Sequence, residues 1–178
     1  MNKSPPSSAS GRRPSLLARW AMVGLLGAAI ASHNAIARWR ESHSFMINTS
    51  ESLPNWAFFV SAGKEPAKGD YVFFVPPPGA LVNRHFGPDQ GPFGKQVIGM
   101  PGAMIEHRGE WVYVDGVKVA RMKARTRLGE LLHPGPTGIV PRDCFYVGTG
   151  HPDGFDSRYA EIGFACRKAI LGTGTPIL

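Results

Sequence analysis

Two serines and one lysine are the side chains whose spacing best suits nucleophilic chemistry. Ser50 and Ser52 lie in the segment Asn48–Pro54, and Lys95 opens the apolar run Lys95–Gly102. A serine hydroxyl is a weak nucleophile unless a nearby base takes its proton. A lysine of ordinary pKa, ~10.4, is protonated at pH 7, so burial must first disfavour its ammonium form. These residues are therefore candidates for acyl transfer by a serine that is activated by a buried lysine.

A third segment, Gly154–Tyr159, contains an aspartate and an arginine beside a turn. Taken singly, each of the three segments also has a simple structural interpretation. They can be a serine-rich turn, a strand-end lysine that reaches water, and a surface ion pair. Lys64 and Lys68 lie among polar residues, whereas apolar residues follow Lys95, so Lys95 is the better candidate base.

The elements that must position these residues are predicted to be short strands. Apolar or alternating runs bounded by turn residues indicate strands, and Asp115-Gly116 suits a two-residue hairpin turn. The predicted strands are 57–60, 71–75, 95–100, 111–114, 117–120, 144–147 and 169–171. Residues 76–94 are rich in Pro and Gly, and we expect a long surface loop there. The fold class is therefore mainly β, with antiparallel sheets.

The N-terminal segment carries most of the excess positive charge. The chain has a formal net charge of +7, and residues 1–40 hold six basic residues and no acidic one. Residues 20–39 are long and apolar enough for a single transmembrane helix, with a tryptophan at each end. Four basic residues precede this segment, which predicts a cytoplasmic tail at 1–19 and an exported domain at 44–178. A cleaved secretory signal that ends near residues 35–37 is the alternative.

Other classes of function are disfavoured. Nucleic-acid binding would require positive charge on the folded body, yet the residues after 40 are nearly neutral, with 14 basic and 13 acidic side chains. The sequence contains no GxSxG, P-loop or GxGxxG motif and no CxxC or HExxH motif, so we predict neither cofactor nor metal. Export would permit a disulfide between Cys144 and Cys166, although the sequence does not show that they are within bridging distance.

The order of the segments resembles the motifs of type I signal peptidases, most closely the TraF-type peptidases of conjugative transfer. Four motifs carry this resemblance, in the order that the family has them. They are Asn48–Pro54, Gly69-Asp70, Lys95–Gly102 and Phe155–Tyr159. The resemblance covers residues 45–172 and implies a signal-peptidase-like β domain behind a single N-terminal anchor.

The resemblance implies a role for each matched residue. Ser52 matches the nucleophile and Lys95 the general base, while the Ser50 hydroxyl and the Ser52 N–H match the donors to the oxyanion. Supporting roles are implied for Asn48, Asp156, Ser157 and Arg158. The sequence departs from the family at Ala103, where the family has Asp, and at Trp56, where the conjugative branch has Gly. It also departs at Gly154, where leader peptidases have a serine that contacts the lysine, and Ser157 is our candidate replacement.

The resemblance also implies the substrate and location. We expect an enzyme of the bacterial inner membrane whose periplasmic domain cleaves precursors with small residues before the cut. The conjugative branch implies a propilin as substrate and membrane lipid as a second partner. A general type I signal peptidase and a non-enzymatic component of a secretion or conjugation apparatus are the alternatives. A self-cleaving regulator of the LexA type would need a DNA-binding domain where residues 1–43 hold an apolar segment.

Overall fold

The computed structural model describes residues 15–177, and the chain divides into two units. The first unit ends at Glu41 and contains helix α1, Leu16–Ser42, except for the last residue of the helix; no side chain of α1 is buried. This helix includes the predicted apolar segment 20–39, and an 18-residue window within it has a mean hydropathy of 1.4, which makes the helix a candidate membrane anchor. Of the predicted basic tail, residues 1–14 lie outside the described residues.

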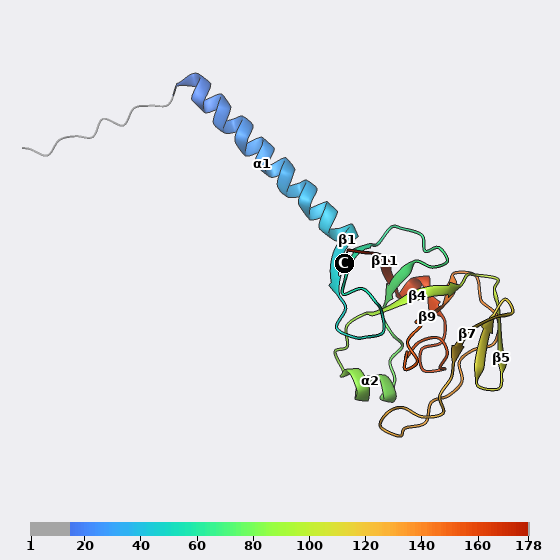
Figure 1. The fold of residues 1–178 in the computed structure, drawn as a ribbon. Helices are drawn as coiled ribbons and strands as arrows, with labels where there is room; N and C mark the ends of the chain where they lie inside the picture. Colours follow the sequence, from blue (N-terminus) through green and yellow to red (C-terminus); the bar gives the residue numbers. More distant parts are fainter. Residues whose placement is uncertain (1–14, 178) are drawn as a thin grey trace, which may run out of the picture. The chain divides into compact units, whose positions relative to one another are not determined.

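The second unit begins at Ser42 and is built mainly from two antiparallel sheets (Figure 1). The larger sheet has the strand order β1-β2-β11-β3-β4-β9-β10, and the smaller has the order β7-β6-β5-β8. The strands of the larger sheet are β1 His43–Ile47, β2 Ala57–Ser61, β3 Tyr71–Phe74, β4 Phe93–Gly99, β9 Cys144–Gly148, β10 Ala165–Cys166 and β11 Ile170–Pro176. The strands of the smaller sheet are β5 Met104–Arg108, β6 Trp111–Val114, β7 Val117–Arg121 and β8 Gly138–Ile139. A short 3₁₀ helix, η1, covers Arg167–Ala169.

The predicted fold class is confirmed, and each of the seven predicted strand segments overlaps an observed strand. The turn between β6 and β7 has the expected backbone, because Asp115 and Gly116 have φ angles of 50° and 76°. Type I′ hairpin turns require positive φ at both of these positions. Strands β1, β5, β8 and β10 were not predicted, and two of them are only two residues long.

The prediction of a loop throughout residues 76–94 is wrong. Residues Ala80–Phe86 form a short helix, α2, and strand β4 begins at Phe93. Val82 is fully buried against the core, and this burial holds the helix in place despite its Pro- and Gly-rich flanks. The helix ends at Gly87, which has a positive φ of 86°.

The two faces of the larger sheet pack into separate clusters. On one face, Val72, Val97 and Val147 belong to a cluster that α2 also joins. On the opposite face, Phe73 packs with Phe58 and other residues from the region of β2. Side chains alternate between faces along a strand, so Lys95, two residues from Val97, lies on the first face.

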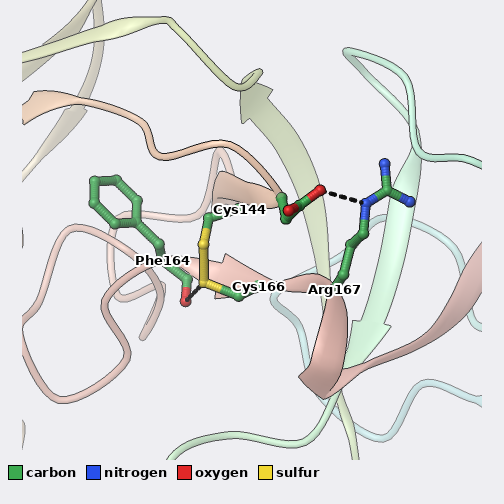
Figure 2. Close-up of a disulfide and its surroundings, with 5 residues drawn as sticks. Cys144, Phe164, Cys166 and Arg167 are labelled. Atoms are coloured by element: carbon green, nitrogen blue, oxygen red, sulfur yellow. Dashed lines mark hydrogen bonds and ion pairs between the residues drawn. A yellow bond between two sulfur atoms is a disulfide. The ribbon is translucent and has the colours of Figure 1, made fainter.

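A disulfide between Cys144 and Cys166 joins β9 to β10 (Figure 2). The two residues are direct partners in the antiparallel register, with Cα atoms 3.9 Å apart. The structure thus resolves what the sequence left open. The two cysteines are 22 residues apart in the sequence, and the chain between them includes the whole Phe155–Tyr159 motif. Beside it, the Arg167 Nε donates to Asp143 at 3.2 Å.

Candidate active site

The segment between β1 and β2, which carries both serines, is held together by Asn48. The Asn48 amide nitrogen donates to the carbonyl oxygens of Leu53 and Asn55, at 3.1 and 3.0 Å. Its amide oxygen accepts from both the backbone N–H and the hydroxyl of Ser50, at 3.1 and 3.0 Å. Leu53 anchors the segment in the core. One side chain therefore organises the loop on which Ser52 lies.

The hydroxyl groups of Ser50 and Ser52 are in direct contact, with 2.7 Å between their oxygens. Because Ser50 gives its only hydroxyl hydrogen to Asn48, Ser52 must be the donor in this bond. Ser50 is exposed and Ser52 is half-buried. The pair thus lies at a surface that a polypeptide can reach.

Lys95 is buried in the middle of the larger sheet. It lies on β4 opposite Val72 of β3, and only 6% of its surface is exposed. Burial lowers the pKa of its ammonium group; the Asp156 carboxylate partly opposes this shift, and the Arg158 guanidinium adds to it. The Nζ atom lies 5.8 Å from the centre of the Phe93 ring. The sequence-based expectation of a lysine in a dry site agrees with this environment.

Ser50, Ser52 and Lys95 line one cavity of about 920 Å³. Aromatic side chains form part of its wall, where Phe86 packs edge-to-face on Phe93 and stacks on Phe155. Within residues 15–177 no hydrogen bond joins Ser52 to Lys95, since the Ser52 hydroxyl is directed to Ser50. The two residues therefore line one cavity, and no hydrogen bond joins them among the described residues.

The Phe155–Tyr159 motif supplies a buried ion pair. Arg158 donates from Nε and Nη2 to the two carboxylate oxygens of Asp156, at 2.8 and 2.9 Å, and both residues are at most 2% exposed. Arg158 also donates to the carbonyl oxygen of Thr149 at 2.8 Å, and Asp156 accepts from the Thr149 N–H at 3.1 Å. The pair thus fixes the chain segment after β9, next to Lys95.

Ser157 is also engaged with β9. Its hydroxyl accepts from the Val147 N–H at 3.0 Å, and its own N–H donates to the Val147 carbonyl at 3.0 Å. Gly154 is buried and lines the cavity. The Ser157 hydroxyl is therefore bonded to the backbone of β9, and among the described residues it forms no hydrogen bond with Lys95.

A second wall of the cavity was not anticipated from the sequence. The loop between β7 and β8 is bound to α2 by Glu130, which contacts Arg84 and His85. The same loop contacts Asp153 through Lys123 and Arg127. These partners are 26 to 46 residues apart in the sequence, so no local pattern could have paired them.

The chain is similar to known proteins in sequence and in structure. The family model described as "Signal peptidase, peptidase S26" matches residues 17–178. A protein of Sinorhizobium fredii, described as "Probable conjugal transfer protein TraF", is 29% identical over 170 residues, which cover 88% of each chain. The crystal structure of a signal peptidase I from Enterococcus faecalis is 24% identical, with a TM-score of 0.37, and covers 63% of this chain and 98% of that one. 

Proposed function

The chain belongs to the signal peptidase family, peptidase S26, and we propose on this basis that it is a membrane-anchored serine endopeptidase with a Ser52–Lys95 dyad. Membership of the family makes it a signal peptidase hydrolase that acts on precursor proteins, with α1 as a candidate anchor. The observation that supports the dyad most strongly is the buried Lys95, which lines the same cavity as Ser52.

In the proposed reaction the neutral Lys95 amine removes the proton of Ser52 as the serine oxygen attacks the scissile carbonyl. The oxyanion accepts hydrogen bonds from the Ser50 hydroxyl and the Ser52 N–H, and one such donor contributes about 3 kcal/mol. Collapse of the tetrahedral intermediate breaks the peptide bond, and the Lys95 ammonium gives its proton to the leaving amine. Lys95 then takes a proton from a water molecule that attacks the ester at Ser52. When the second tetrahedral intermediate collapses, the bond to the Ser52 oxygen breaks and the Lys95 ammonium returns this proton to that oxygen, which releases the acid product.

This mechanism requires two hydroxyl groups to reorient when substrate binds. The Ser52 hydrogen turns from Ser50 toward Lys95, and the Ser50 hydrogen turns from Asn48 toward the oxyanion. Rotation about one or two side-chain bonds changes both directions while Asn48 continues to hold the loop backbone through Leu53 and Asn55. Buried support from Asp156 and Arg158 keeps the Lys95 side of the cavity fixed.

We further propose that the natural substrate is a propilin. The relative described as a conjugal transfer protein supports this assignment. Small residues before the cut are expected from the family, and the open loop at Ser50 and Ser52 suits an extended chain. General processing of exported proteins is the alternative for the same site. A non-enzymatic role in the envelope would need neither Ser52 nor Lys95.

The proposed location is the bacterial inner membrane, with the N-terminus in the cytoplasm and the β domain in the periplasm. The six basic residues in positions 1–40, most of them before the apolar segment, support this orientation. The disulfide supports it independently, because disulfides persist in oxidising compartments such as the periplasm.

The test is precursor cleavage by the full-length protein in detergent or vesicles, with the variants Ser52→Ala and Lys95→Ala. We expect each to lose activity by about 10³-fold or more, because nucleophile and base act as one unit. Ser44→Ala and Lys68→Ala are matched controls that alter exposed residues and should cleave normally. Normal cleavage by folded Ser52→Ala and Lys95→Ala would leave only the non-enzymatic alternative.

The pH profile gives a second readout. Since burial lowers the pKa of Lys95, the reactive neutral amine forms below the ordinary lysine range. We expect kcat/KM to rise with pH and to level off below pH ~10.4. A rise that continues to that value would place the base in a solvated site and contradict the assignment of Lys95. Deletion of the gene then separates the substrates, since a pilin peptidase affects pilus assembly alone.

A further inference from the structure

Three basic side chains line the same cavity as the candidate dyad, and the proposed reaction gives them no role. They are Lys123, Arg125 and Arg127, and together they are called the basic wall. All three are exposed and come from the loop between β7 and β8. Cations that line a cavity attract acidic groups in the molecules that enter it. The balance of charge at this wall therefore bears on which substrates the cavity accepts.

The basic wall carries more positive charge than its acidic partner removes. Lys123 and Arg127 both contact Asp153, and Arg127 donates to this carboxylate from Nε at 3.1 Å and from Nη2 at 2.6 Å. Arg125 donates to the carbonyl oxygen of Gly129 at 2.6 Å, and within residues 15–177 it forms no ion pair with an acidic side chain. Three positive charges and one negative charge leave a net charge of +2 on this side of the cavity.

The loop that carries these side chains is braced at its start and in its middle. The Lys123 N–H donates to the hydroxyl of the buried Tyr159 at 3.0 Å. Further along, the Thr126 hydroxyl accepts from the Glu130 N–H at 3.2 Å, and the Glu130 carboxylate accepts from Arg84 of α2 at 2.7 Å. A group on a braced backbone loses less conformational freedom when it binds a ligand, which favours binding.

The basic wall also acts on the segment that carries the proposed nucleophile. Glu51 directly precedes Ser52, its side chain is 90% exposed, and its carboxylate lies 4.0 Å from the Nε2 of His151. Asp153 raises the pKa of the Arg127 guanidinium most, and the Glu51 carboxylate adds to this increase. A carboxylate beside the nucleophile is therefore attracted by the wall. Since the scissile bond must lie at Ser52, the residues that flank it in a bound precursor pass through the same region.

We propose that the basic wall selects precursors that carry an acidic side chain within about three residues of the cut, a span of about 10 Å in an extended chain. The acidic side chain binds Arg125, whose charge no acidic residue among the described residues shares, with Arg127 as the second donor. This inference rests on the proposed function, because it names the class of precursor that the same site accepts. The small residues expected before the cut are a separate requirement.

The first test uses the full-length protein in neutral detergent and peptides with small residues before the cut. One glutamate is placed at each flanking position in turn, and the matched peptide has glutamine there. At one or more positions we expect kcat/KM to be about 3-fold to 10-fold higher for the glutamate peptide. About 1 M salt should reduce this ratio. A ratio near one at every position would overturn the proposal, even if anionic lipid vesicles bind the basic wall.

Variants of the basic wall sharpen this test. Arg125→Gln combined with Arg127→Gln leaves Lys123 alone with Asp153, so the ratio should fall to about one. Arg125→Glu combined with Arg127→Glu changes the sign of the net charge and should favour a lysine peptide instead. Arg142→Gln alters an exposed arginine outside the cavity, and this matched control should keep the ratio of the wild type. A preference for glutamate that survives the charge reversal would contradict the assignment.

Peptide binding to Ser52→Ala separates this inference from the proposed function. The fluorescence anisotropy of labelled peptides reports affinity without cleavage. We expect the glutamate peptide to bind about 3-fold to 10-fold more tightly than its glutamine match. Equal affinities would refute the acidic preference and leave the dyad with Lys95 intact. A wild-type protein that cleaves none of the peptides would count against the proposed function, while the ratio of affinities would still decide this inference.

Discussion

The two segments that form the candidate site are built in opposite ways. The segment around Ser50 and Ser52 is bonded mainly within itself, and its organising side chain, Asn48, is half-buried. The segment around Asp156 and Arg158 is buried and bonded to the neighbouring strand β9. The difference indicates a division of labour. The Ser50 and Ser52 hydroxyl groups lie on a partly exposed loop, while the environment of Lys95 is fixed by the interior of the fold.

This comparison predicts that changes in the buried segment act mainly on stability and changes in the loop mainly on activity. Arg158→Met should show the largest effect on stability. It leaves the Asp156 carboxylate buried without its partner, which costs about 3–5 kcal/mol of unfolding free energy. Chemical denaturation of the full-length protein measures this change.

Arg108→Met is the matched control, since its partner Glu106 is on the surface and both side chains are well exposed. Loss of an exposed pair costs about 1 kcal/mol or less. Equal losses in the two variants would contradict the view that the Asp156–Arg158 pair is the internal support of the site.

The disulfide joins two half-buried cysteines on either side of the segment that holds this ion pair, and its loss gives the next largest effect. The double substitution Cys144→Ala and Cys166→Ala should lower the unfolding free energy by about 3 kcal/mol, as expected for a closed loop of this length. A reducing agent should destabilise the unsubstituted protein to a similar extent and leave the double variant unchanged. A double variant that unfolds at the same denaturant concentration as the parent would show that the strand pairing alone holds this segment.

Asn48→Ala should show the smallest effect on stability, and it tests the loop that carries Ser50 and Ser52. The lost bonds lie within one partly exposed loop, so we expect the unfolding free energy to fall by about 1–2 kcal/mol. Precursor cleavage should fall by about 10-fold or more, because Ser50 and Ser52 lose their fixed geometry. Thr49→Ala is the neighbouring exposed control and should be silent in both assays. A loss of stability in Asn48→Ala as large as that in Arg158→Met would remove the distinction between the two segments.

Local sequence patterns were sufficient for much of the sheet structure. The strand at Ala57–Val60 and the turn at Asp115-Gly116 can be predicted from the types of residues that are adjacent in the chain. The same reasoning failed for α2, where Val82 is held by contacts with distant strands that outweigh the local effect of Pro and Gly. It also missed β10, a strand of two residues that is too short to show a periodic pattern.

The sequence by itself determined two things. It showed an apolar N-terminal segment, and it showed three motifs in the order of one family: the motif with Ser52, the apolar run that begins at Lys95 and the Asp–Arg motif. Only the tertiary structure decided that Lys95 is buried and that Cys144 is paired with Cys166 across two strands. The reason is physical. Residue types and short spacings are local properties, whereas burial and cross-strand pairing depend on which distant segments the folded chain brings together.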